Sequence, residues 1–160
     1  KYIYSQIGYN VKLTDMQAAI GLAQLKKLPL FIIKRKENYK KLLEGLKKYD
    51  QYLLFSDAEE GADPCWFGFM IVVRDGAPFT RLELVKYLED KKIATRSLFA
   101  GNLLKHPAYL GRKDIHVVGS LTNSDKIMND GFWIGVYPGI NSAMMSYVLR
   151  TFDAFMKSRI

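Results

Sequence analysis

The sequence predicts an α+β fold in which long N-terminal helices lead into a small sheet that is covered by helices. Three patterns predict this fold. Apolar side chains recur at helical spacing over residues 14–48, four short apolar runs lie between turn residues, and three- and four-residue apolar spacing returns near the end of the chain. The 160 residues are enough for one domain with a sizeable core. The order of these elements is that of an α+β protein.

The first helix is expected to begin at Thr14. Gln17 stands three residues further on, so the two side chains can form a capping box. The helical pattern runs to Leu28, and Pro29 marks a break or the first turn of a second helix that continues to about Lys48. Residues 1–13 form a loop before this pair, and helices of this length need something large to pack against.

Residues 49–160 are expected to form the C-terminal α+β domain. The predicted strands are 52–55, 66–73, 93–99 and 132–137, and the predicted helices are 80–91, 121–128 and 145–156, with a loop at 101–113. The two middle strands and the helix between them form a strand–helix–strand unit. We expect the helices to cover one face of the sheet, and the chain to be compact apart from its first dozen residues.

Composition limits the classes of function. The net charge is +8, and many of the lysines lie between residues 34 and 48, where they are typical of the solvated side of an amphipathic helix rather than of a nucleic-acid surface. No apolar run approaches the roughly 20 residues that cross a bilayer, and no signal-peptide pattern is seen, so we expect a cytoplasmic protein without a membrane partner. The single cysteine, Cys65, excludes an internal disulfide and offers no metal-site spacing.

Several motifs occur in order along the chain. They are residues 4–25 (YSQIGYNVKLTDMQAAIGLAQL), 63–69 (DPCWFGF), 95–102 (TRSLFAGN), 117–123 (VVGSLTN) and 127–139 (IMNDGFWIGVYPG). Together they resemble the nucleotide-sugar aminotransferase and dehydratase family, fold-type-I enzymes that use pyridoxal or pyridoxamine 5'-phosphate. Within that family they look most like the CDP-linked 4-keto-6-deoxyglucose 3-dehydratases of lipopolysaccharide biosynthesis.

The resemblance implies that the chain is the C-terminal piece of a longer, homodimeric enzyme. Its first 13 residues would belong to the cofactor domain, residues 14–48 would connect the domains, and the rest would be the small α+β domain. The reaction implied is 3-deoxygenation of a nucleotide-linked 4-keto-6-deoxyhexose. The catalytic base would lie before Tyr4, and an iron–sulfur cluster, served by a flavin or iron–sulfur reductase, would lie before Lys1. The isolated piece is therefore expected to be inactive.

The loop before the first helix carries the candidate cofactor-binding residues. Gly8 permits a turn or a close approach, and Tyr9 and Asn10 offer a phenol and an amide suited to an anion or a sugar, although such a loop can also merely pack. The resemblance implies that Asn10 contacts the cofactor phosphate of the neighbouring subunit. Gln6 is a candidate substrate contact at a position where relatives often carry histidine, so an acid–base role cannot be carried over.

Two further segments carry candidate substrate-binding residues. The resemblance places Trp66, Phe67 and Gly68 beside the cofactor and sugar, where aromatic faces pack well against a pyranose. The alternative for Trp66 is a core aromatic, and strand alternation requires that one of the two aromatic side chains face away. The other candidates are Arg96, Phe99, Asn102 and Lys126, the last at a position where the resembled branch often has arginine.

No catalytic residue, metal site or nucleophilic triad is visible in the sequence. His106 and His116 lack carboxylate or cysteine partners at ligand spacing, so we assign both to structural roles. A sugar aminotransferase of the same family is the nearest alternative function. Alternatives from other classes are a basic nucleic-acid-binding module, which would need aromatics interleaved with its basic residues, and a non-catalytic dimerisation module.

Overall fold

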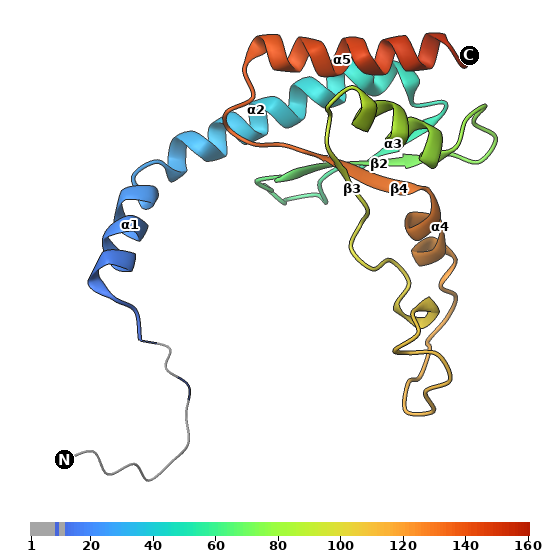
Figure 1. Cartoon of the computed structure of the whole chain (residues 1–160), viewed down its shortest axis with the longest axis horizontal. Helices are drawn as coiled ribbons and strands as arrows, with labels where there is room; N and C mark the ends of the chain where they lie inside the picture. Colours follow the sequence, from blue (N-terminus) through green and yellow to red (C-terminus); the bar gives the residue numbers. More distant parts are fainter. Residues whose placement is uncertain (1–8, 10–11) are drawn as a thin grey trace.

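The computed structural model describes Tyr9 and residues 12–160. Figure 1 shows a helical arm that leads into a body of helices and strands. The helices are α1 (Asp15–Leu25), α2 (Leu28–Leu46), α3 (Arg81–Asp90), α4 (Thr122–Asp130) and α5 (Ser142–Lys157). The strands are β1 (Leu53–Phe55), β2 (Gly68–Val73), β3 (Thr95–Arg96) and β4 (Gly131–Gly135), and single turns of 3-10 helix lie at Lys47–Tyr49 and Leu103–Lys105. The α+β fold class is thereby confirmed.

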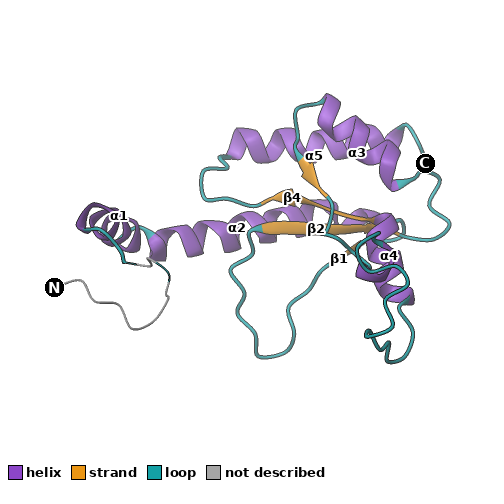
Figure 2. Cartoon of the chain, turned by 60° about the horizontal axis from the view of Figure 1, so that its bottom comes forward, coloured by secondary structure: helices purple, strands orange, loops and turns teal. Residues whose placement is uncertain are grey.

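The four strands form one antiparallel sheet in the order β1-β2-β4-β3. The strand–helix–strand unit predicted from the sequence exists as β2-α3-β3, but β4 lies between its two strands (Figure 2). The last strand in the sequence is therefore inserted at the centre of the sheet, where it pairs with both neighbours. This arrangement brings residues near 70, 96 and 133 into one row.

One face of the sheet is buried under α2, α3 and α5. Side chains alternate along each strand, so Phe69 and Ile71 of β2 and Phe132 and Ile134 of β4 point to this face and are almost fully buried. They belong to a single core cluster with residues from all three covering helices. Helices α2 and α5 approach closely at Gly45, where a β-carbon would lie 2.6 Å from Cδ2 of Leu149.

Two predicted helix starts are confirmed, whereas the last helix begins at Ser142, three residues before the predicted range of 145–156. Thr14 with Gln17 caps α1, and Thr80 with Glu83 caps α3, each as a complete capping box. Pro29 lies in the first turn of α2, where its missing N–H group leaves no hydrogen bond unmade.

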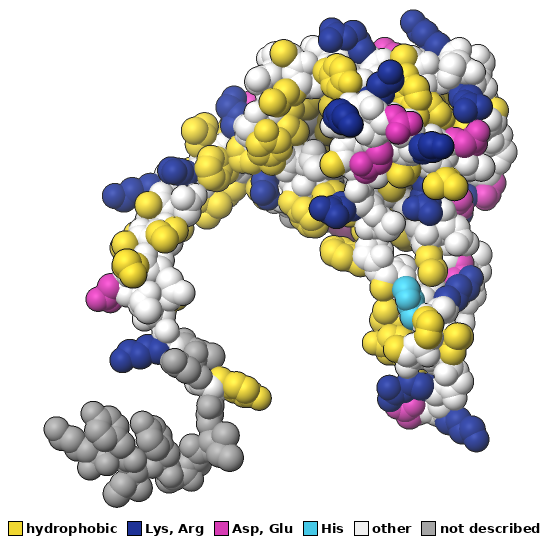
Figure 3. Space-filling view, viewed as in Figure 1, with side chains coloured by type: hydrophobic (Ala, Val, Ile, Leu, Met, Phe, Trp, Pro, Cys, Tyr) yellow, Lys and Arg dark blue, Asp and Glu magenta, His cyan; other side chains and the backbone are white. Residues whose placement is uncertain are grey.

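Helix α1 lies apart from the body. None of its residues is buried, and Figure 3 shows apolar side chains along the arm. Its exposed large apolar residues are Met16, Ile20, Leu22 and Leu25. The expectation that the chain is compact beyond its first dozen residues is therefore wrong, whereas the expectation that this helix pair needs a partner agrees with the exposure.

The described part of the chain holds no single helix that is long and apolar enough to cross a membrane. Helix α1 together with the stretch from Leu28 to Tyr49 meets the length and composition criteria only as a pair bent by 51°.

Two other expectations need correction. The strand predicted at 93–99 is only two residues long, because the backbone leaves the sheet after Arg96 and reaches a left-handed conformation at Phe99, with φ of 46°. The strand predicted from Trp66 begins at Gly68, so both aromatic residues lie in the loop that enters β2. The division of the chain after residue 48 stays a prediction, and the C-terminal half of α2 packs into the body.

Candidate functional site

The second face of the sheet is not covered by α2, α3 and α5. The register pairs Met70 of β2 with Trp133 of β4, and Trp133 with Arg96 of β3. Since directly opposed residues lie on the same side of a sheet, these three side chains form a row across this face, which we call the open face. Helix α4 contacts β2 and β4 at one end of the same face, where a β-carbon at Gly131 would lie 2.9 Å from Cε of Met70.

A hollow of about 220 Å³ lies on the open face and is largely apolar. The Phe67 ring meets the Trp133 indole edge to face, with ring centres 5.2 Å apart and planes at 78°. Gly68 leaves room for this indole, since a β-carbon there would lie 2.7 Å from Cε3 of Trp133. The lining residues are Ser56, Trp66, Phe67, Gly68, Met70, Leu98, Phe99 and Trp133.

Trp66 belongs both to the hollow and to the core. Its ring stacks on Tyr39 of α2, with centres 5.0 Å apart and planes at 16°, while Phe67 is exposed on the other side. Strand alternation had predicted that one of the two would face away, but both residues lie in the loop before β2 and both line the hollow. The Tyr39 hydroxyl donates to the backbone oxygen of Ser56 at 2.6 Å, and burial, assisted by the negative charge of Asp57, raises the pKa of Tyr39 to about 12. Tyr39 therefore stays neutral and fixes Trp66.

Phe99 lines the hollow, and Arg96 lies beside it, opposite Trp133 on the neighbouring strand. Arg96 is exposed next to Trp133, and in the described part of the chain no carboxylate lies within ion-pair distance of its guanidinium. The Phe99 side chain is 78% exposed although it lines the hollow. A free guanidinium beside exposed aromatic rings is suited to a ligand that carries both a phosphate and a ring.

Asn102 and Lys126 do not line this hollow. Asn102 is buried, and its amide donates to Asp125 at 2.7 Å. The Lys126 ammonium pairs with Asp75 at 2.5 Å and with Asp130 at 2.9 Å, so it ties the turn after β2 to α4. The net effect of these partners is a pKa of Lys126 above its usual value, although its partial burial acts in the opposite direction. The structure thus gives both residues intramolecular partners.

The candidate cofactor-binding loop is described only at Tyr9, whose side chain is 94% exposed. Gln6, Gly8 and Asn10 lie outside the described residues, so their roles stay predictions.

Trp133 and Met70 were not among the residues predicted to line the site, and neither was Leu98. A signal for Trp133 was present in the sequence, because Phe132 and Ile134 are apolar neighbours in a strand and alternation directs the residue between them to the other face. The sequence held no such signal for Leu98, because the position of its side chain depends on how the backbone turns after β3.

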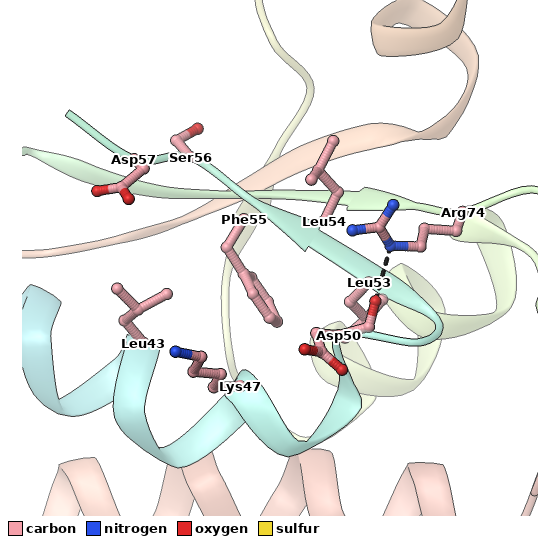
Figure 4. Close-up of a pocket in the computed structure, with 9 residues that line it drawn as sticks. All are labelled: Leu43, Lys47, Asp50, Leu53, Leu54, Phe55, Ser56, Asp57 and Arg74. Atoms are coloured by element: carbon pink, nitrogen blue, oxygen red, sulfur yellow. Dashed lines mark hydrogen bonds between the residues drawn. The ribbon is translucent and has the colours of Figure 1, made fainter. Parts of the chain in front are cut away.

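A second hollow, of about 210 Å³, lies between the C-terminal end of α2 and β1 (Figure 4). It carries two cations, Lys47 and Arg74, and the Nε of Arg74 donates to the backbone oxygen of Asp50 at 2.7 Å. None of the residues predicted to bind substrate or cofactor lines it. We therefore place the candidate site on the open face.

The open face offers binding groups rather than an acid–base pair. His106, which was assigned a structural role, has its Nε2 2.6 Å from the backbone oxygen of Ala100. Among the described residues no group of three or more histidine, cysteine, aspartate or glutamate side chains is placed to hold a metal ion.

Comparison with known proteins supports the family resemblance of the motifs. Residues 1–153 match the model of the DegT/DnrJ/EryC1/StrS aminotransferase family. The chain is 48% identical over 155 residues to the lipopolysaccharide biosynthesis protein RfbH of Salmonella typhimurium, a match that covers 97% of this chain and 35% of that protein. It is 44% identical over 156 residues to a dTDP-4-dehydro-2,6-dideoxy-D-glucose 3-dehydratase of Saccharopolyspora spinosa, with coverage of 98% and 33%.

A solved structure of a related enzyme has a similar fold. The GDP-4-keto-6-deoxy-D-mannose-3-dehydratase of E. coli with bound hydrated PLP has a TM-score of 0.81 and 29% identity, and the match covers 94% of this chain and 38% of that one. The chain thus spans about a third of the length of the curated relatives named above. Motifs, fold and family match agree, and the chain belongs to the DegT/DnrJ/EryC1/StrS aminotransferase family.

Proposed function

We propose that this chain is part of a nucleotide-sugar 3-dehydratase of deoxysugar biosynthesis and that its open face forms one wall of the sugar-nucleotide site. Two of the relatives named above are called 3-dehydratases of nucleotide-linked keto sugars, and a third takes part in lipopolysaccharide biosynthesis. The substrate class is a nucleoside-diphosphate-linked 4-keto-6-deoxyhexose, and the CDP-linked glucose derivative is the first compound to test.

The observation that carries this proposal is the convergence of Phe67, Arg96 and Phe99 around Trp133. These residues come from three separate segments, and all of them lie on or beside the open face. Exposed aromatic faces bind the apolar side of a pyranose or a nucleobase, and a guanidinium binds a diphosphate through charged hydrogen bonds. The chain's own contribution is to bind and orient the substrate and to keep water away from the reacting carbon.

When bound, pyridoxamine phosphate supplies an amine and an electron-accepting ring that help the 3-hydroxyl group of a 4-keto sugar to leave. From the family resemblance, Gly8, Tyr9 and Asn10 are proposed to contact its phosphate, and the open face is proposed as the substrate wall.

The remaining assignments follow from the family resemblance and are proposals of the same kind. The parent protein is a cytoplasmic homodimer, its catalytic base lies upstream of this chain, and an upstream iron–sulfur cluster receives electrons from a reductase. The family description names aminotransferases, so transfer of an amino group to the sugar is the alternative reaction.

The test is an assay of the full-length parent, loaded with pyridoxamine phosphate and supplied with a flavin or iron–sulfur reductase and a reduced nicotinamide as the two-electron donor, on CDP-4-keto-6-deoxyglucose, with dTDP- and GDP-linked 4-keto-6-deoxy sugars as comparisons. Mass spectrometry of the product distinguishes the reactions: we expect loss of the 3-hydroxyl group and release of water. Formation of a 4-amino sugar would move the assignment to an aminotransferase. No reaction with any of the three nucleotide sugars would overturn the proposed function.

A further inference from the structure

The segment Leu98–Gly101 forms one wall of the hollow in a conformation that is costly to maintain. Phe99 has φ of 46°, which a bulky L-residue rarely adopts, and Gly101 follows with φ of 63°. The segment also lies tightly on α4, since a β-carbon at Gly101 would come within 2.6 Å of Cβ of Met128. Strain of this kind persists only where neighbouring contacts hold the backbone in place.

A polar cluster lies directly behind this wall. Asn102 is only 6% exposed, its Nδ2 donates to Oδ1 of Asp125 at 2.7 Å, and its Oδ1 accepts from the backbone N–H of Leu104 at 3.1 Å. The Lys105 ammonium lies 2.9 Å from the same Asp125 oxygen. Both the side-chain nitrogen and the side-chain oxygen of Asn102 thus form hydrogen bonds within the protein.

The cluster joins two elements that are far apart in sequence. Asn102 and Lys105 belong to the segment that follows the wall, and Asp125 belongs to α4, which packs against the end of the open face. Hydrogen bonds from Lys105 and from Asn102 hold the pKa of Asp125 below its usual value, so the carboxylate is charged near neutral pH. Charge-assisted hydrogen bonds of this kind are the stronger ones in proteins.

We infer that Asn102 is a positioning residue: through Asp125 it fixes Leu98–Gly101 so that Phe99 stands as a wall of the substrate hollow. Asn102 itself does not contact the substrate, in contrast to the direct contact expected from the sequence. The substrate half of this inference rests on the proposed function. The structural half, the fixing of the wall by Asp125, does not.

The structural half is tested by hydrogen exchange of residues 98–105 in the full-length protein. Asn102→Asp keeps an acceptor for the Leu104 amide but sets two carboxylates against each other, and we expect at least tenfold faster exchange. The double variant Asn102→Asp with Asp125→Asn restores a donor and an acceptor, and exchange should return to within about twofold of the wild type. Asn129→Ala, an exposed asparagine on the same helix, is the matched control. Equal exchange in the single and double variants would overturn the inference.

The substrate half is tested by steady-state kinetics of the same variants with the nucleotide sugar. A displaced wall weakens binding more than it slows the reaction at a distant carbon, so Asn102→Asp should raise KM at least fivefold, change kcat less than twofold, and be rescued by the double variant. Unchanged KM together with faster exchange would overturn the substrate role. An inactive wild type would instead count against the proposed function, while the exchange result would still decide whether the cluster fixes the wall.

Discussion

The two faces of the sheet are made by the same strands but have opposite properties. Phe132, which is 1% exposed, points into the core beneath the helices, and its neighbour Trp133 points to the open face. On the core face large apolar side chains are buried among other parts of the chain, whereas on the open face aromatic side chains line a hollow. Alternation along a strand therefore separates the residues that stabilise the fold from those available to bind a ligand.

The largest expected effect is a difference in the free energy of unfolding between alanine variants of Phe132 and Trp133. Phe132→Ala removes a fully buried ring and should lower the free energy of unfolding by about 3–5 kcal/mol. Trp133→Ala should cost markedly less, because its ring is only partly buried. Urea denaturation of both variants provides the measurement, and a loss for Trp133→Ala as large as that for Phe132→Ala would remove the distinction between the faces.

A second prediction compares two glycines that oppose each other on β2 and β4. Gly68→Ala places a methyl group against the Trp133 indole and should cost about 1–3 kcal/mol and alter tryptophan fluorescence. Gly135→Ala is the matched control, because nothing lies within 4 Å of a β-carbon there. Equal effects of the two changes would show that the indole does not occupy the space above Gly68.

A third prediction compares the two capping boxes. Thr80→Ala should destabilise the body by about 1 kcal/mol, since α3 packs on the sheet and on α5. Thr14→Ala should leave global unfolding of the 160-residue chain unchanged, because α1 buries no residue in the body. Thermal unfolding monitored by circular dichroism measures both, and a loss for Thr14→Ala equal to that for Thr80→Ala would contradict the separation of α1 from the body.

The smallest effect concerns pH. The pKa of Asp125 is lowered in the folded state by hydrogen bonds from Lys105 and Asn102, so its contribution is complete above the usual aspartate pKa of about 3.9 and is lost as pH falls through the folded value. Exchange of residues 98–105, corrected for the intrinsic pH dependence of exchange, should therefore be constant from neutral pH to about pH 5 and accelerate only below pH 4. In Asp125→Asn this acid-dependent acceleration should be absent, and its persistence would assign it to another group.

Local signals in the sequence predicted much of the fold correctly. Both capping boxes, the position of Pro29 in α2 and the apolar stripe of α5 depend on residues a few positions apart. The insertion of β4 between β2 and β3 was not predictable in this way, because strand order depends on pairing between distant segments.

In the candidate site, too, some features were predicted from the sequence and others depend on distant segments. Phe67, Gly68, Arg96 and Phe99 were predicted from motifs and do lie on or beside the open face. The intramolecular roles of Asn102 and Lys126 were missed. Their partners Asp125 and Asp75 are 23 and 51 residues away in sequence, whereas the pairing of Lys126 with Asp130, four residues further on, was a local signal that was not used. A charged or amide side chain in a motif has the same appearance in the sequence whether its partner is a ligand or a distant carboxylate.

The most direct test of the account is the substrate KM of the full-length protein with Trp133→Ala, measured beside Phe132→Leu, a conservative core change at the neighbouring position. If the open face binds the nucleotide sugar, Trp133→Ala should raise KM at least tenfold, while Phe132→Leu should lower stability and leave KM within about twofold of the wild type. A KM for Trp133→Ala equal to that of the wild type would contradict the assignment of substrate binding to the open face.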